Sequence, residues 1–285
     1  MKLILNLKYL NVQSMGYIKS RLSEFNGRYK LTLTKLLRMV FIAISPRSIK
    51  LKSTLKSGIK ITGFNRPGWG GRGVFISRED IEPEVKLLKF FLKKGDCFID
   101  IGANVGLYTL SAANILGSQG KVISYEPIPS IFNNLSENVS LNNFQTIVSC
   151  RNMCVDNFTG SSKLWMNFDR PVSFSLKKQT DVEKYIHTFS VCLKDLVVFE
   201  KLDKIDYIKI DAEGKELDII QSGKNEILKF RPVVQLEGWR EEMKNVFLDY
   251  KFVHSINNRN TLVIPNEIFE NLSISFDKKD WRIHE

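Results

Sequence analysis

Short apolar runs alternate with helical patterns along most of the chain after residue 95, and this alternation constrains the fold more than any other feature. The runs are rich in Val, Ile and aromatic residues, and most lack polar alternation, as expected of strands buried on both faces. This alternation of strands and helices predicts a parallel sheet with right-handed crossovers. The predicted strands are Cys97–Ile101, Val122–Tyr125, Thr146–Cys150, Tyr207–Ile210 and Val233–Leu236, and the predicted helices are Tyr108–Leu116, Ser130–Leu141 and Lys215–Phe230.

Two later segments depart from the alternation. Residues 152–191 follow no regular period and predict extra strands and a substrate-facing loop, whereas Lys251–Ile256 and Thr261–Ile264 predict a terminal hairpin. The expected fold class is therefore α/β: a Rossmann-like, doubly wound, mostly parallel sheet with a C-terminal antiparallel hairpin, preceded by a small basic N-terminal element.

The chain divides into three predicted parts. Residues 1–57 form a basic, partly helical arm, residues 58–94 a small β and helix lead-in packed on the main domain, and residues 95–285 the main domain. Residues 1–60 hold 13 of the 42 Lys and Arg residues and one acid, Glu24, so they net +12 while the rest nets −1. Such an arm, which includes an amphipathic helical pattern at Leu31–Ile44, could meet an anionic membrane, nucleic acid or an acidic partner, or form a solvated face.

The cysteines and the N-terminal sequence indicate whether a metal cluster is expected and in which cellular compartment. The four cysteines form no C-x-x-C pair and no His lies at zinc-finger spacing, which predicts a reducing compartment without a metal cluster. The start of the chain lacks a secretory pattern, and the apolar run Leu36–Ser45 is about half the ~20 residues that a membrane-spanning helix needs. We expect a cytoplasmic protein, with peripheral contact to the membrane as an option.

A glycine-containing loop follows the first predicted strand and opens a helix. In it, Gly102 permits a sharp turn, Gly106 lets the helix start pack close to the sheet, and Asn104 tolerates the positive φ at which related loops use glycine. The spacing is not G-x-G-x-x-G, so a dinucleotide pyrophosphate is not its natural ligand. The candidate cofactor-binding residues are Asp100, Gly102, Ala103, Asn104 and Gly106.

Acidic residues follow several of the predicted strands. Glu126 ends the second strand, where a carboxylate can accept hydrogen bonds from both hydroxyls of a ribose. Asp211 and Glu213 follow the strand Tyr207–Ile210, and Glu216 suits a helix N-terminus. Because ligands bind at the carboxyl ends of parallel strands, these acids, with Asp100 and Glu237, predict a site for a cation. The sulfonium of S-adenosylmethionine is one candidate, and a divalent metal such as magnesium is the other; no motif identifies metal ligands.

In this order the motifs resemble those of the FkbM-type methyltransferases, a branch of the class I S-adenosylmethionine-dependent enzymes. The resemblance implies that Asp100, Gly102 and Gly106 form the cofactor loop, that Glu126 holds the ribose and that Asp156 lies near the adenine. The matching pieces cover about half of the chain and read GDCFIDIGANVGLYTLSAA, GKVISYEPIPSIFNNLSENVSLNN, CVDNFTG, DYIKIDAEGKELDII and LKFRPVVQLEG.

The family mostly methylates hydroxyls, often on sugars or glycosylated products. The resemblance therefore implies S-adenosylmethionine as cofactor and O-methylation of a sugar, glycosylated or lipid-linked product, with Asp211 and Glu213 near the transfer site. A hydroxyl must lose its proton as it attacks the methyl group, and the candidate bases are Asp211, Glu213 and His254. Much of the acceleration would come from holding donor and acceptor in line. Lys215 stands where the family usually has a small residue, which bears on local packing.

Three other functions compete with this interpretation. A nucleic-acid methyltransferase is disfavoured because Asp-Ala-Glu-Gly replaces the Asp- or Asn-Pro-Pro-aromatic motif, and no basic run interleaves with aromatics. The glycine spacing disfavours a dehydrogenase. The intact loop at Asp100 and Glu126 argue against an inactive membrane-surface scaffold. We further expect residues 1–56 to contact an anionic membrane, near lipid-linked or envelope glycans.

Overall fold

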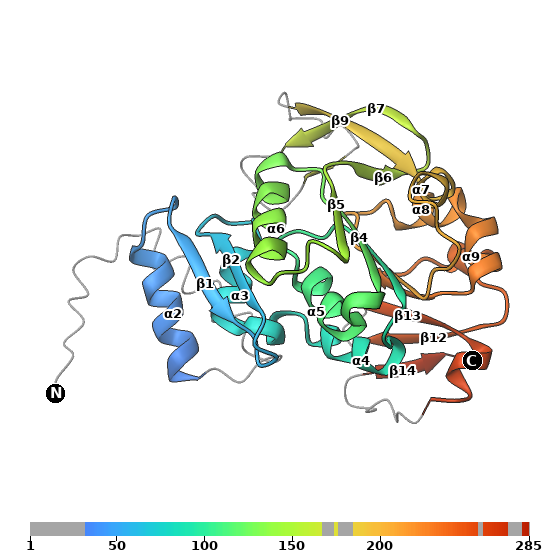
Figure 1. Ribbon diagram of the computed structural model, residues 1–285, viewed down its shortest axis with the longest axis horizontal. Coiled ribbons are helices and arrows are strands. Elements are labelled where there is room, and N and C mark those ends of the chain that lie inside the picture. Colours follow the sequence, from blue (N-terminus) through green and yellow to red (C-terminus); the bar gives the residue numbers. More distant parts are fainter. Residues whose placement is uncertain (1–31, 167–173, 176–184, 256–258, 273–280, 285) are drawn as a thin grey trace. The chain divides into compact units, whose positions relative to one another are not determined.

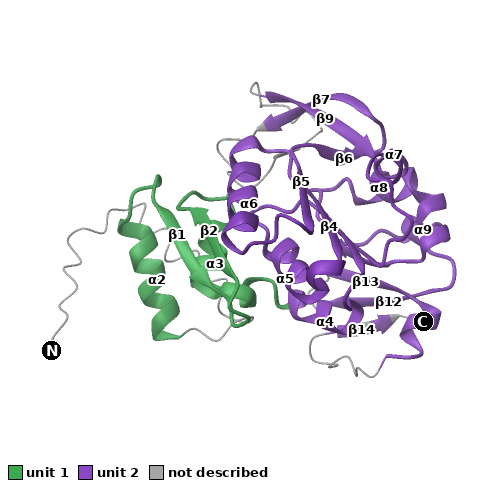
Figure 2. Cartoon of the chain, viewed as in Figure 1, with its two compact units in different colours: residues 1–83 green, residues 84–285 purple. Residues whose placement is uncertain are grey.

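The computed structural model describes residues 32–166, 174–175, 185–255, 259–272 and 281–284. They fall into two compact units, residues 1–83 and residues 84–285 (Figure 2). The predicted domain boundaries at 57/58 and 94/95 do not coincide with this division. The antiparallel pair of β1 (Lys50–Thr54) and β2 (Lys60–Phe64) spans the first of them.

The described part of unit 1 packs two helices against the β1–β2 hairpin. The helix α2 (Leu33–Ile44) lies within the basic amphipathic segment expected to be helical, and Thr32 caps it by accepting a hydrogen bond from Lys35 N at 3.3 Å. A second helix, α3 (Gly71–Ser77), follows the hairpin. The small core between these elements consists of Met39, Ile42, Leu51 and Ile76.

Asn65 joins the elements of unit 1. Its buried side chain donates to the carbonyls of Ile42 at 3.0 Å and Ser45 at 2.9 Å, which have no partner within α2. Arg72 of α3 donates to Asn65 Oδ1 at 2.8 Å. A Cβ on Gly71 would lie 2.6 Å from the backbone of Gly63, so α3 can approach the hairpin only because residue 71 is glycine.

Unit 2 contains an eight-stranded sheet, in the order β14-β12-β13-β11-β10-β3-β4-β5 (Figure 1). The five strands from β11 to β5 are parallel, and β13 runs antiparallel to both of its neighbours. This sheet confirms the predicted α/β fold class with its C-terminal antiparallel hairpin. The strands are β3 (Cys97–Ile101), β4 (Lys121–Tyr125), β5 (Val148–Arg151), β10 (Tyr207–Ile210), β11 (Val233–Glu237), β12 (Tyr250–Ser255), β13 (Asn260–Pro265) and β14 (Trp281–His284).

Helices cover both faces of the sheet. On one face α5 (Leu107–Leu116) packs against β3 and β4, and α6 (Pro129–Leu141) against β5. On the other face, α7 (Leu193–Phe199), α8 (Glu216–Ser222) and α9 (Lys224–Phe230) enclose an apolar core. The remaining short helical segments of unit 2 are η3 (Pro83–Leu87), α4 (Leu88–Phe91), η4 (Gly117–Gln119), η5 (Glu241–Asn245) and α10 (Asn266–Phe269).

The irregular segment 152–191 contributes a second sheet, in the order β6-β9-β7-β8. Its first pair is parallel and the others are antiparallel. Residues 167–173 and 176–184, which include part of the expected substrate-facing loop, lie outside the described residues. The strands are β6 (Cys154–Asp156), β7 (Gly160–Met166), β8 (Phe174–Ser175) and β9 (Tyr185–Cys192).

The long helix predicted over Lys215–Phe230 is two helices, α8 and α9, which meet at Gly223. A Cβ at Gly223 would collide with the side chain of Leu193, so the absence of a side chain at residue 223 lets α7 pack closely there. The periodic apolar pattern continues through this break, so periodicity alone predicted one helix where there are two.

Candidate functional site

A row of polar side chains crosses the centre of the main sheet on the face that α5 covers. Ser124, Asp100, Lys209 and Gln235 are neighbours in register on β4, β3, β10 and β11. All four are buried, and Lys209 is 5% exposed. Strands buried on both faces are usually apolar, so this row must be satisfied internally.

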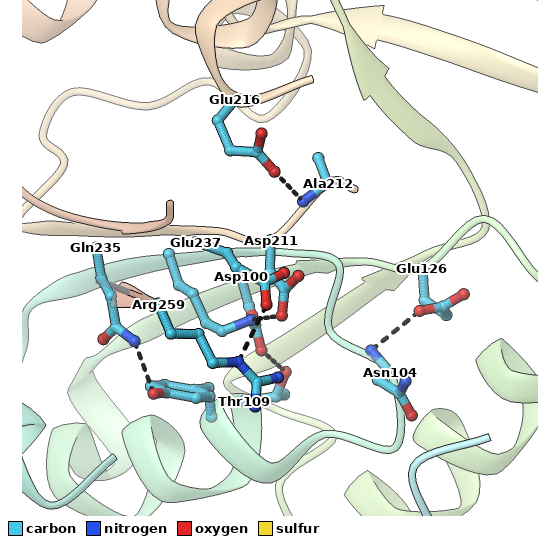
Figure 3. A network of polar contacts seen from close by, with 12 residues as sticks. Asp100, Asn104, Thr109, Glu126, Asp211, Ala212, Glu216, Gln235, Glu237 and Arg259 are labelled. Carbon is cyan, nitrogen blue, oxygen red and sulfur yellow. Dashed lines mark hydrogen bonds and ion pairs between the residues drawn. The ribbon is translucent and has the colours of Figure 1, made fainter. Parts of the chain in front are cut away.

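The helix α5 supplies many of the partners of the polar row. Thr109 donates to Asp100 Oδ2 at 2.6 Å and lies 2.7 Å from Ser124 Oγ. Gln235 donates to the Tyr108 hydroxyl at 2.7 Å, and Lys209 Nζ lies 4.9 Å from the centre of the Tyr108 ring (Figure 3). The buried Asp100 Oδ1 accepts no hydrogen bond from the described residues, and burial raises the pKa of Asp100.

The loop after β3 has the backbone geometry that the sequence predicted. Gly102 and Gly106 have positive φ values of 79° and 93°, and Asn104 has φ of 51°, which confirms the left-handed conformation expected there. A Cβ on Gly102 would collide with the carbonyl oxygen of Asp211, so this glycine lets the loop after β3 meet the loop after β10. The backbone N–H groups of Gly102 and Ala103 both donate to Tyr125 O at 3.0 Å.

Gly106 serves a different contact from the one expected. A Cβ there would lie 2.6 Å from Leu135 Cδ1 on α6, so the glycine allows close packing between two helices and not between helix and sheet. The adjacent N-terminus of α5 is thereby fixed against α6. Asn138 of α6 also donates to Val105 O at 2.9 Å.

Glu126 connects the glycine loop to the end of β4. It is buried, and one carboxylate oxygen accepts from Asn104 N at 3.0 Å (Figure 3). The other carboxylate oxygen accepts from Ile128 N at 2.9 Å. Burial raises the pKa of Glu126 to about 7, although the two N–H donors oppose that shift. The carboxylate therefore lies beside the loop, where the sequence placed a ribose-binding acid.

The ends of β10 and β11 bring together two carboxyl groups. Asp211 and Glu237 share a hydrogen bond, Lys209 Nζ lies 3.1 Å from Asp211 Oδ2, and Arg259 Nε lies 3.2 Å from Glu237 Oε1. Burial alone would raise the pKa of Asp211, but Lys209 and the hydrogen bond from Glu237 lower it. Burial and the bond to ionised Asp211 raise the pKa of Glu237 to about 8. The pair therefore favours an ionised Asp211 beside a Glu237 that holds its proton more tightly.

The turn between β10 and α8 places Glu213 and Glu216 differently. Glu213 is exposed with a φ of 50°, and burial of its carboxyl end together with Asp211 raises its pKa to about 7. Glu216 is buried and accepts from Ala212 N at 3.0 Å (Figure 3). The same Glu216 oxygen accepts from Gly214 N at 3.2 Å. The prediction that Glu216 serves the helix start is confirmed, since it holds the turn that carries Asp211.

Asp156 lies at the end of β6 in an ion pair with Lys215. Lys215 Nζ is 3.0 Å from Asp156 Oδ1 and 3.0 Å from Asp218 Oδ2, and Asn157 N donates to the same Asp156 oxygen at 2.8 Å. The lysine that departs from the usual family pattern therefore links the turn after Asp211 to the second sheet.

His254 lies apart from this group. It is on β12, which β11 and β13 separate from β10, so roughly 14 Å of sheet lies between the histidine and Asp211. His254 Nδ1 lies 2.8 Å from Thr261 Oγ1, and the ring packs at 5.4 Å against that of Trp239. The structure thus brings together Asp100, Glu126, Asp211 and the glycine loop, but not His254.

Sequence reasoning missed the two cations of the site. A lysine inside the apolar strand Ile208-Lys-Ile was the available signal for Lys209, because an unpaired charge is rarely buried in a central strand. Nothing in the sequence connects Arg259 with Glu237. Over the described residues, no three His, Cys, Asp or Glu side chains are grouped so that they could hold a metal ion.

The family model described as the methyltransferase FkbM domain matches residues 100–270, which is more than half of the chain. The chain belongs to the FkbM methyltransferase family. The matched span includes every element of the FkbM site described above, from Asp100 on β3 to Arg259 before β13.

Solved structures of similar fold include a methyltransferase FkbM from Methylobacillus flagellatus KT, with 13% identity over 67% of this chain and 52% of that chain, at a TM-score of 0.42. A SAM dependent methyltransferase from Aquifex aeolicus has 14% identity over 64% and 87%, at 0.37. Trm5b from Pyrococcus abyssi has 11% identity over 84% and 57%, at 0.44. The chain spans about half the length of the FkbM structure from Methylobacillus (52%). No curated protein sequence matches it.

Proposed function

We propose that this FkbM-family chain transfers a methyl group from S-adenosylmethionine to a hydroxyl group. The acceptor in this proposal is a sugar or a glycosylated product, including a lipid-linked one. The observation that carries the proposal is the Asp211–Glu237 pair at the carboxyl end of the central strands. It combines an ionised carboxylate with an adjacent acid, in the place where open parallel sheets bind their ligands.

The residues present fit S-adenosylmethionine. Gly102 lets the loop after β3 lie directly against the loop after β10, so the two loops that would hold the cofactor form one surface. Glu126 lies beside that loop with a carboxylate that can accept from ribose hydroxyls. Asp156 would lie near the adenine of the cofactor and Asp100 near its amino-acid end. Ala103, Asn104 and Gly106 would shape the loop. When bound, the cofactor supplies a methyl group activated by a positive sulfur.

Asp211 is the base in this proposal. As the acceptor oxygen takes the methyl group, its proton would pass to Asp211, which Lys209 holds ionised and Glu237 holds in orientation. Glu213, exposed beside the same turn, is the alternative base, whereas His254 is too distant to serve the same hydroxyl. Alignment of donor and acceptor contributes most of the acceleration.

One observation favours nucleic acid as the alternative acceptor. On the β1–β2 hairpin, Lys50 Nζ lies 5.2 Å from the centre of the Phe64 ring, and nearby Arg66 packs at 4.7 Å over Trp69. The fold therefore brings Lys50 beside the short segment that holds Phe64, Arg66 and Trp69, and such basic and aromatic groups can contact phosphates and bases.

A membrane contact through residues 1–56 is a further part of the proposal. Leu33, Leu37, Phe41 and Ile44 are exposed along one side of α2, within the segment that nets +12. An apolar stripe within a basic segment suits the surface of an anionic membrane. Among the described residues, no helix has the length and apolarity to cross a bilayer.

Calorimetric titration tests the cofactor assignment. The full chain is titrated with S-adenosylmethionine and with NAD, each with and without magnesium. Micromolar binding of S-adenosylmethionine without magnesium is expected, and binding of NAD alone would refute the assignment. Transfer of a labelled methyl group to glycan or to RNA fractions then decides between the two acceptor classes. Exclusive labelling of RNA would replace the sugar proposal.

A further inference from the structure

The second sheet presents aromatic side chains on one face. The strands β7 and β9 are antiparallel, and side chains alternate between the two faces of such a pair. On the inward face, Leu164 is buried and Ser162 bonds to Ser190 at 2.6 Å. The outward face carries Trp165, Tyr185, His187 and Phe189, here named the aromatic face.

Three side chains of the aromatic face, those of Trp165, Tyr185 and His187, lie in contact as a row. The rings of Trp165 and Tyr185 are 5.0 Å apart, and those of Tyr185 and His187 are 5.3 Å apart. Lys163 Nζ lies 4.4 Å from the centre of the Tyr185 ring. Tyr185 and Phe189 are nonetheless 38% and 41% exposed. Water-exposed rings held in a fixed row mark an interaction surface better than scattered apolar residues do.

The row leads away from the candidate site. Asp156 of β6 is paired with Cys192, the last residue of β9. Because a strand rises about 3.3 Å per residue, Phe189, His187 and Tyr185 lie roughly 10, 17 and 23 Å from that point. The aromatic face therefore continues outward from the edge of the site that Lys215 and Asp156 form.

We propose that the aromatic face binds the sugar rings of an extended glycan whose terminal hydroxyl is methylated at Asp211. Sugar rings present flat C–H faces that stack on aromatic rings, and their hydroxyls suit Ser161, His187 and the Tyr185 hydroxyl around them. This inference rests on the proposed sugar O-methylation, and it adds that the acceptor is a chain and not a single sugar.

The charge of this face favours a glycan over a nucleic-acid strand. Among the side chains that the structure describes on β6, β7 and β9, Lys163 is the one with an Arg or Lys charge. A single-stranded nucleic acid requires a positive groove along its backbone as well as stacking rings. A neutral or weakly charged oligosaccharide has no such requirement.

Binding of the full chain to a printed glycan array tests the proposal, followed by titration of each bound glycan. The variants Trp165→Ala, Tyr185→Ala and Phe189→Ala should each weaken that binding at least about fivefold, as removal of one stacking ring does. Phe199→Ala, an exposed aromatic on α7, is the matched control and should bind like the wild type. Unchanged affinity for S-adenosylmethionine and an unchanged circular dichroism spectrum establish that each variant folds.

Two results would overturn the aromatic face as a glycan site. One is the absence of any bound glycan together with binding of a twenty-nucleotide RNA, and the other is glycan binding that survives all three substitutions. Failure of the proposed reaction gives a different pattern. In that case the bound glycans depend on the aromatic face but accept no labelled methyl group.

Discussion

The Lys209 ammonium lies 3.1 Å from the Asp211 carboxylate, two residues along the chain and at the buried centre of the sheet. Lys209 is also the register neighbour of Asp100, whose carboxyl group bonds to Thr109. One cation therefore compensates two acids of the site, Asp100 on β3 and Asp211 in the loop after β10. The protonation of the proposed base depends on a side chain that substrate need never touch.

Lys209→Met should leave these carboxyl groups buried without a counter-charge. We expect a loss of about 3–5 kcal/mol in the free energy of unfolding and a higher pKa for Asp211. The acidic limb of the pH profile of kcat should move to higher pH. The double variant Lys209→Met/Asp211→Asn should regain part of the stability, because it removes both charges. If the losses in unfolding free energy of the two single variants add up to that of the double variant in denaturant unfolding, Lys209 and Asp211 are not coupled.

Glu126 should make cofactor binding pH-dependent. Its pKa of about 7 means that it is protonated at lower pH, so its ability to accept from two ribose hydroxyls falls there. Affinity for S-adenosylmethionine should drop by up to about tenfold per pH unit below pH 7 and level off above it. Calorimetry of Glu126→Gln should show a flatter curve and a loss of about 1–3 kcal/mol at pH 8. Exposed Glu241→Gln provides the control.

The raised pKa of Glu126 also makes the stability of the ligand-free fold depend on pH, in the direction opposite to that of cofactor binding. The pKa of Glu126 is raised from 4.5 to about 7 on folding, so the folded state binds this proton more tightly than the unfolded chain. Its stabilising contribution is complete below about pH 4.5 and is lost as the pH rises to 7. Thermal unfolding of the wild type and of Glu126→Gln at several pH values measures this contribution. Stabilities that depend on pH with the same slope in both proteins would exclude it.

Gly102→Ala isolates the contact between the two loops of the site. Gly102 and Gly95 have similar φ values of 79° and 83°, but only the Gly102 Cβ would collide, with Asp211 O, whereas the Gly95 Cβ meets nothing within 4 Å. Gly95→Ala should cost about 1–2 kcal/mol from backbone strain, and Gly102→Ala about 3 kcal/mol or more. Equal costs in urea unfolding would show that the close approach is unimportant.

Membrane contact is tested by substitutions that leave unit 1 folded. Leu33, Leu37 and Phe41 are exposed, so Gln at all three should preserve the core while removing the apolar stripe of α2. Sedimentation with anionic vesicles should weaken at least about tenfold. Phe90→Gln, exposed in unit 2, should sediment like the wild type. Equal sedimentation of the triple variant would refute the contact.

The sequence predicted the regular parts of the structure well. The strand bounds at Cys97–Ile101 and Tyr207–Ile210 are those observed, because apolar runs bounded by turn residues define short buried strands. The glycine loop and the acids after the strands were recognisable because chain order places them at one edge of a parallel sheet. The break at Gly223 was not, since it depends on Leu193, which is distant in sequence.

Side-chain partners across strands were the part that the sequence could not specify. The pairing of Arg259 with Glu237 follows from a register between β11 and β13 that no local pattern determines. The aromatic face was hidden for the same reason, since Trp165 and Tyr185 are twenty residues apart and become neighbours only in the antiparallel pair.

Glu216 holds the Asp211 turn by accepting two of its backbone N–H groups. The interval of four residues between the two acids is therefore a fixed mechanical length: a single inserted or deleted residue would detach the carboxylate from its support. The exposed side chain of Glu213 within that interval carries no such constraint. Residue 213 is instead limited by its φ of 50°, which favours Gly, Asn or Asp, while the interval itself keeps its length.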